Sequence, residues 1–165
     1  MKKTFASLLL STGFVVSAHA QTPPNTLITY AVIDKPEVVD ASPVGPSVGD
    51  MYLRHGDVMF TPDGEAVGTY FSKGTIVMWD KTKKMTATAF SSELVLPEGT
   101  IYKTDFVQGT LNAEGKYERA SAGHKHQGAI LGGTGKYAGI RGAYEIEVMD
   151  SGKLGKTTHQ FWLGQ

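Results

Sequence analysis

The stretch from Gly128 to Val148 reads GAILGGTGKYAGIRGAYEIEV, and it decides the fold of this chain. It begins with a short apolar run, passes through five glycines between positions 132 and 142, and ends in an alternating segment, 143–148. Glycine reaches positive backbone angles without steric cost and lets two backbones approach closely. Glycines at this density predict a tight corner between two strands. The stretch therefore indicates the fold rather than an active site.

The first twenty residues have the three parts of a secretory signal peptide. A basic start at residues 2–3 precedes a mostly apolar part, 8–16, and Ala18-His19-Ala20 forms a small-residue cleavage site. The apolar part is shorter than the roughly 20 residues that span a bilayer, and no cysteine follows it to carry a lipid. We expect an exported chain, periplasmic or extracellular, without a membrane anchor, whose single domain covers residues 21–165.

The composition excludes several classes of function. Lysine and arginine together number 16, as do aspartate and glutamate, and removal of the signal peptide leaves a net charge of about minus two. Nucleic-acid binding depends on clustered cations, so no nucleic-acid partner is expected. The chain has no cysteine, which excludes thiolate chemistry, iron-sulfur clusters and cysteine-ligated zinc.

Extended segments separated by turn residues run through the rest of the chain. The proline- and glycine-rich stretch 34–49 is expected to be a long connection, because proline lacks a backbone donor. Strands are predicted at 27–33, 50–60, 65–79, 85–96, 101–111, 116–122, 125–131, 143–149 and 156–163. No helical period persists for ten residues. The spacing predicts an all-β fold, an antiparallel sandwich or a closed barrel, and the mixed faces of 65–79 leave open which side is internal.

Residues 132–142, GGTGKYAGIRG, carry a resemblance to a known family. An apolar strand end followed by GG[ST]G, an aromatic residue and a closing small-x-x-G is similar to the allene oxide cyclase-like barrels, and GTGKY followed by RG resembles the plant dirigent proteins. Phe106-Val107-Gln108-Gly109 resembles a VQG-like strand end of the cyclases, 49–50 and 57–61 fit the early strands, and 159–163 fits the closing strand. The resemblance implies an eight-stranded antiparallel barrel of the calycin type, often a homo-oligomer such as a dimer or trimer.

The resemblance also implies a mostly apolar cavity that binds an apolar or amphipathic small molecule without a cofactor. Such barrels hold a flexible intermediate in its cyclising geometry, so that positioning rather than strong acids or bases lowers the barrier. One hypothesis is therefore an exported cyclase, isomerase or dirigent-like protein. The alternatives are a non-catalytic carrier or scavenger of apolar molecules and a structural, subunit-forming barrel. From the dirigent pattern Arg141 and Asp57 carry over, whereas the lack of cysteine argues against allene oxide cyclisation itself.

Two residues are candidates for catalysis, Glu93 and Arg141. Glu93 shares a strand face with Ala89, Ser91 and Val95, and if that face points inward its carboxyl group can act as an acid or a base. A solvated outer glutamate is the alternative. Arg141 follows the glycine corner, where a guanidinium can orient a carboxylate or an enolate or form a structural salt bridge. Polar groups that converge on one inner wall favour an enzyme, and a smooth apolar wall favours a carrier.

Aromatic and basic side chains from several strands form the predicted ligand-binding set. They are Tyr52, Arg54, Tyr70, Tyr102, Phe106, Tyr144 and Trp162. His124 and His126 have a spacing that a metal site can use with a third ligand from His55 or His159, but an exposed hairpin tip explains the pair as well, and no metal is predicted. Glu145 and Glu147 share a face that is expected to be the polar outside of the barrel.

Export is tested by N-terminal sequencing of the protein recovered from the periplasm or medium of an expressing bacterium. We expect the chain to begin at or near Gln21, because the small residues before it suit the signal peptidase. The variant Ala20→Asp removes the small residue at the cleavage site and should accumulate as a precursor. An intact Met1 on the exported protein would contradict the prediction.

Overall fold

The computed structural model describes residues 24–32, 36–41, 43–110, 122–149 and 154–163. These residues form nine β-strands and one short 3-10 helix. The elements are β1 (Asn25–Val32), β2 (Glu37–Val39), β3 (Met51–Met59), β4 (Gly68–Asp80), β5 (Met85–Leu96), β6 (Gly99–Thr110), β7 (Lys125–Gly133), η1 (Gly135–Tyr137), β8 (Arg141–Val148) and β9 (Leu154–Trp162). No helix in the described part of the chain is long and apolar enough to cross a membrane. The expected signal peptide and most of the predicted strand 116–122 lie outside the described residues.

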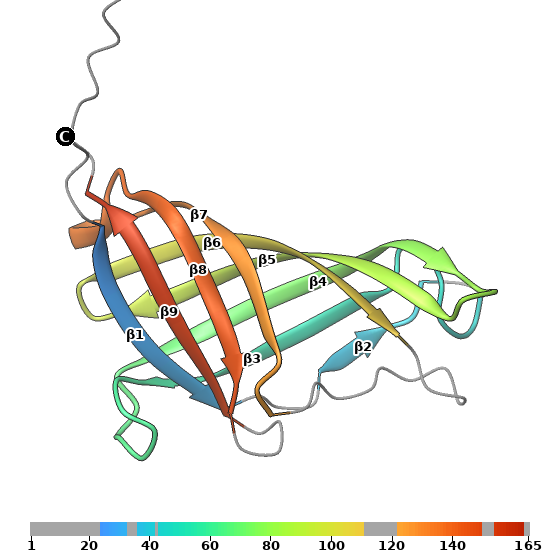
Figure 1. Ribbon diagram of the computed structural model, residues 1–165, viewed down its shortest axis with the longest axis horizontal. Helices are drawn as coiled ribbons and strands as arrows, with labels where there is room; N and C mark the ends of the chain where they lie inside the picture. Colours follow the sequence, from blue (N-terminus) through green and yellow to red (C-terminus); the bar gives the residue numbers. More distant parts are fainter. Residues whose placement is uncertain (1–23, 33–35, 42, 111–121, 150–153, 164–165) are drawn as a thin grey trace, which may run out of the picture.

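Eight of the strands form a closed antiparallel barrel (Figure 1). Their order is β1-β9-β8-β7-β6-β5-β4-β3, and β1 returns to β3 through Tyr30 opposite Met59 and Ala31 opposite Val58. The structure therefore confirms the predicted eight-stranded all-β barrel. The ninth strand, β2, pairs with β3 and lies inside the stretch 34–49 that was predicted to be only a connection. The flanking prolines keep it to three residues.

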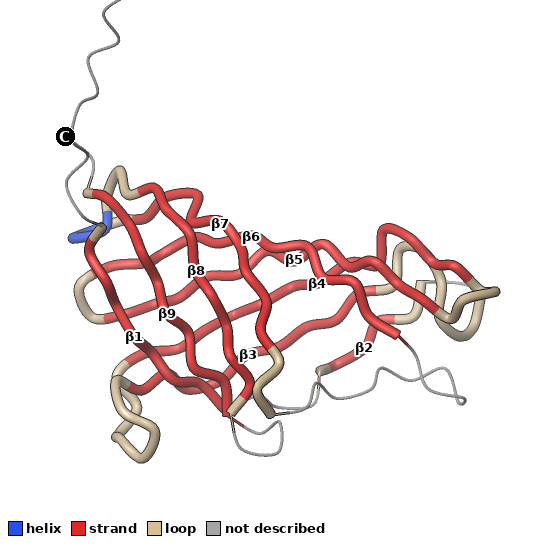
Figure 2. The backbone as a smooth tube through the Cα atoms, in the orientation of Figure 1, coloured by secondary structure: helices blue, strands red, loops and turns tan. Residues whose placement is uncertain are grey.

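The barrel is longer on one side than on the other. Figure 2 shows β1, β9, β8 and β7 crossing over β3 to β6, with η1 at one end and the turn between β4 and β5 at the opposite end. β4 is the longest strand, at 13 residues, and β5 and β6 follow with 12 each; the paired ends of β4 and β5 project beyond the barrel wall. The glycine-rich corner therefore closes one end of the barrel, and the β4–β5 hairpin extends from the other.

Strand register decides which side chains face the interior. Leu94 of β5 is buried and lies opposite both Tyr70 of β4 and Ile101 of β6. Because side chains alternate along a strand, Tyr70 and the residues two positions apart from it face inward, and Phe71 faces outward, where it is half exposed. The structure thus places Tyr70, Ser72, Gly74 and Ile76 of the segment 65–79 on the inner face, and a register shift after Ile76 ends this alternation.

An apolar core fills the end of the barrel that carries η1. Tyr137 and Ile140, on either side of the corner, are both buried, and the Tyr137 ring packs edge-on against Phe161 at a centroid distance of 6.1 Å. The other core residues come from six strands around them. They are Val58, Leu94, Leu96, Ile101, Ile130, Tyr144 and Phe161. Burial of each large apolar side chain contributes about 1.5–3 kcal/mol, so this end supplies much of the stability of the barrel.

The corner is held against the β5–β6 turn by backbone contacts. The Lys136 amide donates to the Glu98 carbonyl at 2.8 Å, and the Thr134 amide donates to the Thr100 carbonyl at 2.9 Å. Gly135 has a φ of +57°, and a Cβ atom there would lie 2.3 Å from the Glu98 carbonyl oxygen. Glycine is required at this position for both its backbone angle and the close approach. The predicted role of the glycine stretch as a corner is confirmed.

Three glycines on the inner wall each lie directly opposite an aromatic residue of the neighbouring strand. The pairs are Gly56 with Tyr70, Gly74 with Phe90, and Gly128 with Tyr144. A Cβ atom on Gly74 would lie 2.3 Å from the Phe90 ring, and one on Gly128 would lie 2.6 Å from the Tyr144 ring. Each ring therefore folds over the backbone of its glycine and fills the space that a side chain would occupy.

The substitution Gly74→Ala tests this packing. Its new methyl group would meet three atoms of the Phe90 ring within 2.8 Å, so we expect a loss of about 1–3 kcal/mol in the free energy of unfolding. Phe90→Leu removes the obstructing ring atoms, so the double variant should lose less than the sum of the two single losses. Urea unfolding of the four proteins measures the coupling, and strictly additive losses would contradict the proposed contact.

Candidate functional site

Polar side chains occupy the middle of the inner wall, beside the apolar core. Arg54 lies opposite Ser72, Ser72 opposite Ser92, and Ser92 opposite Lys103, so these four residues form a continuous line across β3, β4, β5 and β6. We call this line the basic row. The next inward line contains Phe90, Asp105, Gly128, Tyr144 and His159. The two lines bring most of the inward ionisable groups together.

Lys103 is the most deeply buried cation of the barrel, with 7% of the residue exposed. Its Nζ lies 3.5 Å from His159 Nε2 and 4.7 Å from the centre of the Tyr144 ring. The contact with the ring face is a cation–π interaction. Burial lowers the pKa of Lys103 to about 8, against a smaller opposite effect of the Asp105 charge. The amine therefore carries its charge at neutral pH with only neutral groups in direct contact.

His159 is fully buried between β1 and β8. Its Nδ1 lies 3.2 Å from the Leu27 carbonyl oxygen, which can only accept a hydrogen bond. We therefore assign the proton of the neutral ring to Nδ1, which leaves Nε2 to accept a hydrogen bond from the Lys103 ammonium. Burial, and then the charge of Lys103, lower the pKa of His159 to about 3, so the imidazole stays neutral.

Tyr144 links these groups to an acidic side chain. Burial, followed by the Asp105 carboxylate, raises the pKa of the Tyr144 phenol, whose hydroxyl also interacts with Ser92. The phenol stays protonated and available as a donor. Its ring lies over Gly128, and the centroid of the His159 ring is 6.2 Å away. Tyr144 is thus the centre of the polar cluster.

Asp105 and His126 form a hydrogen-bonded pair on the inner wall. Asp105 Oδ2 lies 3.1 Å from His126 Nε2, and the side chain of Asp105 is 5% exposed. A carboxylate accepts the proton on Nε2, which leaves Nδ1 as the nitrogen that can take up a proton, and this is the arrangement of a general base. Asp105 Oδ1 is buried and has no hydrogen-bond partner among the described residues. Asp105 Oδ1 therefore has acceptor capacity that no described residue uses.

The predicted ligand-binding residues divide between the two faces of the wall. Tyr52, Arg54, Tyr70 and Tyr144 lie on inward positions. Tyr102, Phe106 and Trp162 lie on the outer face and are 37%, 56% and 41% exposed. The structure brings the first group together around the barrel interior and separates the second group from it.

The two candidate catalytic residues also lie on the outer face. Glu93 is exposed and lies opposite Phe71 and Tyr102, which face outward. Arg141 lies opposite Trp162, is exposed, and donates from Nη1 to the carbonyl of its neighbour Ile140 at 2.7 Å. Three strand intervals separate β5 from β8. The structure therefore does not bring Glu93 and Arg141 together.

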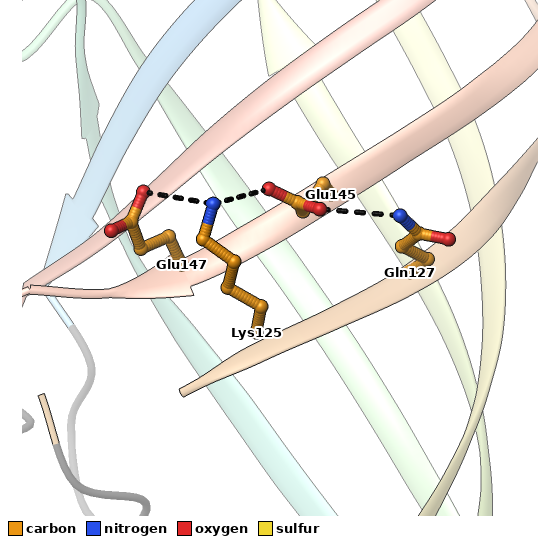
Figure 3. A network of polar contacts seen from close by, with 4 residues as sticks. All are labelled: Lys125, Gln127, Glu145 and Glu147. Atoms are coloured by element: carbon orange, nitrogen blue, oxygen red, sulfur yellow. Dashed lines mark hydrogen bonds and ion pairs between the residues drawn. The ribbon is translucent and has the colours of Figure 1, made fainter. Parts of the chain in front are cut away.

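The outer face of β7 and β8, on which Glu145 and Glu147 were expected to lie, carries a polar network (Figure 3). Lys125 Nζ lies 2.9 Å from Glu145 Oε1 and 3.7 Å from Glu147 Oε2. Gln127 donates to the other oxygen of Glu145 at 3.2 Å. The network is exposed, so its contribution to stability is small and sensitive to salt. It belongs to the solvated surface of the barrel.

The two histidines of the predicted hairpin tip have different surroundings. His126 faces inward and pairs with Asp105, whereas His124 is exposed, with its ring 6.3 Å from that of His126. Among the described residues, no three metal-ligating side chains are grouped closely enough to hold a metal ion.

Asp57, carried over from the dirigent pattern, lies on the outward side of β3. It lines an open cleft of about 340 Å³ with Val32, His55 and Gly56.

Lys103 and Asp105 were missed by the sequence analysis, and His159 and His126 were weighed only as metal ligands. Lys103 and Asp105 alternate with Tyr102 and Phe106, and an aromatic pair favoured the opposite face of the strand as the inner one. A usable signal was present: Ile101 follows the tight turn after Leu96, and apolar residues on both sides of that turn share the inner face with Lys103.

The fold and this interior define a closed antiparallel barrel with a polar inner wall, and comparison with known proteins supplies its family. A family model described as the allene oxide cyclase barrel like domain matches residues 28–158. The chain therefore belongs to that family, and the resemblance drawn from residues 132–142 is confirmed.

Solved structures share the fold at low sequence identity. A pyocyanin demethylase superposes with a TM-score of 0.62 at 20% identity, covering 84% of this chain and 100% of the demethylase. The Diels-Alderase AbmU from Streptomyces koyangensis gives 0.60 at 20% identity, over 84% of this chain and 68% of its own. The pterocarpan synthase dirigent protein GePTS1 gives 0.59 at 14% identity, over 97% and 100%. No curated protein matches by sequence. At these identities the likeness shows the fold alone.

The buried imidazole of His159 predicts an acid-sensitive stability. The pKa of His159 is about 6.5 in the unfolded chain and about 3 in the folded chain. Between these two pH values the unfolded chain binds a proton at His159 and the folded chain does not. The folded state therefore loses about 1.4 kcal/mol per pH unit from this group as the pH falls through that window.

The variant His159→Gln lacks this proton uptake. Its stability deficit relative to the wild type should be largest near pH 7 and should shrink by about 2–3 kcal/mol by pH 4.5. Urea unfolding across this pH range measures it, with His124→Gln at an exposed position as the matched control. Parallel pH profiles of the wild type and His159→Gln would contradict a buried neutral imidazole.

Proposed function

We propose that this chain is an exported barrel that binds an apolar or amphipathic small molecule in its interior and steers it through a cyclisation or isomerisation. The observation that carries the proposal is the convergence of Tyr144, Asp105, His126 and His159 on one inner wall. Membership of the allene oxide cyclase barrel family supports it, as does the fold shared with Diels-Alderases and a dirigent protein.

The inner wall has the parts that such steering requires. The aromatic rings of Tyr70, Phe90 and Tyr144 are fixed over their glycines, so they present rigid surfaces to an apolar ligand. A ligand held between fixed walls loses conformational entropy when it binds, so that less entropy is lost on the way to the transition state. Positioning lowers the reaction barrier in this way. The rate gain then comes mainly from the shape of the interior.

Proton transfer is the second contribution that this wall can make. Asp105 accepts the proton on His126 Nε2, which leaves Nδ1 as the nitrogen that can take up a proton from a ligand, and the Tyr144 phenol remains a donor because burial raises its pKa. A base and a neutral donor on one wall are suited to moving a proton between two positions of a bound molecule. A carrier without catalysis has no use for this pair, which is why we favour an enzyme over the carrier alternative.

Interior binding is tested with the neutral fluorescent probe N-phenyl-1-naphthylamine. Ser92 and Ser91 are neighbours on β5, but Ser92 faces inward and Ser91 is exposed. We expect Ser92→Phe to reduce probe affinity by about tenfold or more, because the added ring fills the interior, and Ser91→Phe to leave it within about twofold. Fluorescence titration measures both, and urea unfolding confirms that the variants fold.

Native mass spectrometry of the protein purified from cells complements the titration, since a retained molecule would identify the ligand. It should be lost from Ser92→Phe and kept by Ser91→Phe. Wild-type protein that neither retains a molecule nor binds the probe would contradict the proposed function.

A further inference from the structure

We propose that Lys103 forms a covalent imine with the carbonyl group of an apolar aldehyde or ketone held in the barrel interior. The inference rests on the proposed interior binding, and it adds the reactive group of the ligand and the side chain that bonds to it. Lys103 is a buried nucleophile on the inner wall, and the proton transfer through His126 and Tyr144 does not use it.

The side chain of Lys103 starts on β6 and ends against β8 and β9. Ile130 of β7 lies opposite Lys103, and the amine reaches past this strand to contact Tyr144 of β8 and His159 of β9. Most lysines extend along a surface and keep the ammonium in water. Lys103 instead carries its amine into the part of the interior where we propose that a ligand binds.

The contacts of Lys103 do not fix it in the charged form. Among the described residues its Nζ directly contacts His159 Nε2, at 3.5 Å, and the face of the Tyr144 ring. Both groups are neutral, so neither is the carboxylate partner that holds a structural lysine protonated. Burial lowers the pKa of Lys103 to about 8, against a smaller opposite effect of the Asp105 charge. About a tenth of the amine is therefore free at pH 7, and buried lysines of this kind are suited to imine formation.

His159 orients the free amine. Its Nδ1 lies 3.2 Å from the Leu27 carbonyl oxygen and donates to it, so Nε2 is the acceptor that faces Lys103. A neutral amine has two N–H groups and one lone pair. The N–H group that meets Nε2 leaves the lone pair directed away from the imidazole. Because His159 is itself fully buried, it holds the amine in this position before a ligand arrives.

Tyr144 supplies the proton that imine formation needs, since its hydroxyl belongs to the ring that the amine contacts. The lone pair of the amine forms a bond to the carbonyl carbon, and the π electrons of the C=O bond move to oxygen. The oxygen takes a proton from Tyr144, and the nitrogen returns one. The new hydroxyl group then leaves as water with a second proton from Tyr144 while the nitrogen lone pair forms the C=N bond. The proton left on nitrogen restores the phenol, so one carbonyl and one amine give one imine and one water.

The surroundings of the amine set the rest of the ligand. Ile130 beside Lys103 is buried, the Tyr144 ring lies over Gly128, and Phe90 lies over Gly74. These aliphatic and aromatic surfaces fit an apolar carbonyl compound rather than a hydrophilic sugar. A protonated imine also withdraws electrons from the adjacent C–H bond, which assists the proton shift of an isomerisation on the same wall.

The test traps the imine by reduction. 2-Naphthaldehyde is an apolar carbonyl probe, and sodium cyanoborohydride at pH 7 reduces its imines to stable secondary amines. In the wild type we expect Lys103 to be labelled about tenfold or more faster than Lys73, which is exposed on the outer face of β4, because far less of an exposed amine is free at this pH. Peptide mapping by mass spectrometry measures both sites and separates them from the α-amino group, which also reacts near neutral pH.

Two matched variants and one competitor assign the label. Lys103→Arg keeps a cation but cannot form an imine, so it should lose the fast label and keep the slow label on Lys73. Lys73→Arg should lose only the slow label. Excess N-phenyl-1-naphthylamine should slow the labelling of Lys103 by about tenfold and leave that of Lys73 within about twofold. Urea unfolding shows whether the variants fold, and the comparison of the two lysines within the wild type needs no variant.

The outcomes separate this proposal from the proposed function. If N-phenyl-1-naphthylamine binds the wild type but Lys103 is labelled no faster than Lys73, the imine is overturned and interior binding stands. Fast labelling of Lys103 that excess N-phenyl-1-naphthylamine does not slow would place the reaction outside the ligand site and also overturn the imine. If the wild type neither binds this probe nor retains a molecule, the proposed function fails and the imine fails with it.

Discussion

The packing of the Tyr144 ring over Gly128 is the contact on which the interior of this barrel depends. A Cβ atom at Gly128 would lie 2.6 Å from two ring atoms of Tyr144 and 2.5 Å from the Thr104 carbonyl oxygen, so no other residue fits there without moving the ring or the strand. The position of the ring then determines what surrounds it. Its face receives the Lys103 ammonium, its neighbour on β9 is His159, and its hydroxyl meets Asp105 and Ser92. The absence of a side chain at Gly128 thus allows the Tyr144 ring to lie where Lys103, His159 and Asp105 surround it.

One end of the barrel interior is apolar and the middle of its wall is polar. The apolar end stabilises the fold, and the buried polar groups reduce its stability. The end closed by η1 is filled by apolar side chains, whose burial stabilises the barrel. The middle of the wall holds a lysine with only neutral contacts and an imidazole kept neutral, both of which reduce stability because charged forms are poorly solvated there. Burial of apolar side chains at the η1 end offsets the cost in stability of burying these polar groups.

The sequence predicted the fold better than the site. The reason is that it does not show which alternate residues of a strand face the interior of the barrel. Turn residues and the glycine corner are local signals, and they located strands such as 85–96 to the residue. The inner face is a tertiary property, since one residue along a strand changes the side. On β6 the exposed Tyr102 and Phe106 looked more like cavity lining than the alternating Lys103 and Asp105 did, because a buried lysine is rare. On β5 the same alternation put Glu93 outside and Ser92 inside.

The pairing of β6 with β7 explains how the glycine stretch determines both the fold and the site. The register shifts between Tyr102 and Lys103, so that Ile130 lies opposite Lys103 and Gly132 opposite Tyr102, with Leu131 as the extra residue. A bulge of this kind changes the side-chain alternation of one strand relative to its partner. Gly133 lies opposite the inward Ile101 and so faces inward. In a strand without the bulge, strict alternation from Gly133 would turn Gly128 and Ile130 outward. The bulge lets the corner dock on the β5–β6 turn while Gly128 still faces inward beneath Tyr144. The same glycine-rich segment that closes the barrel therefore also sets the register in which a polar site can form inside it.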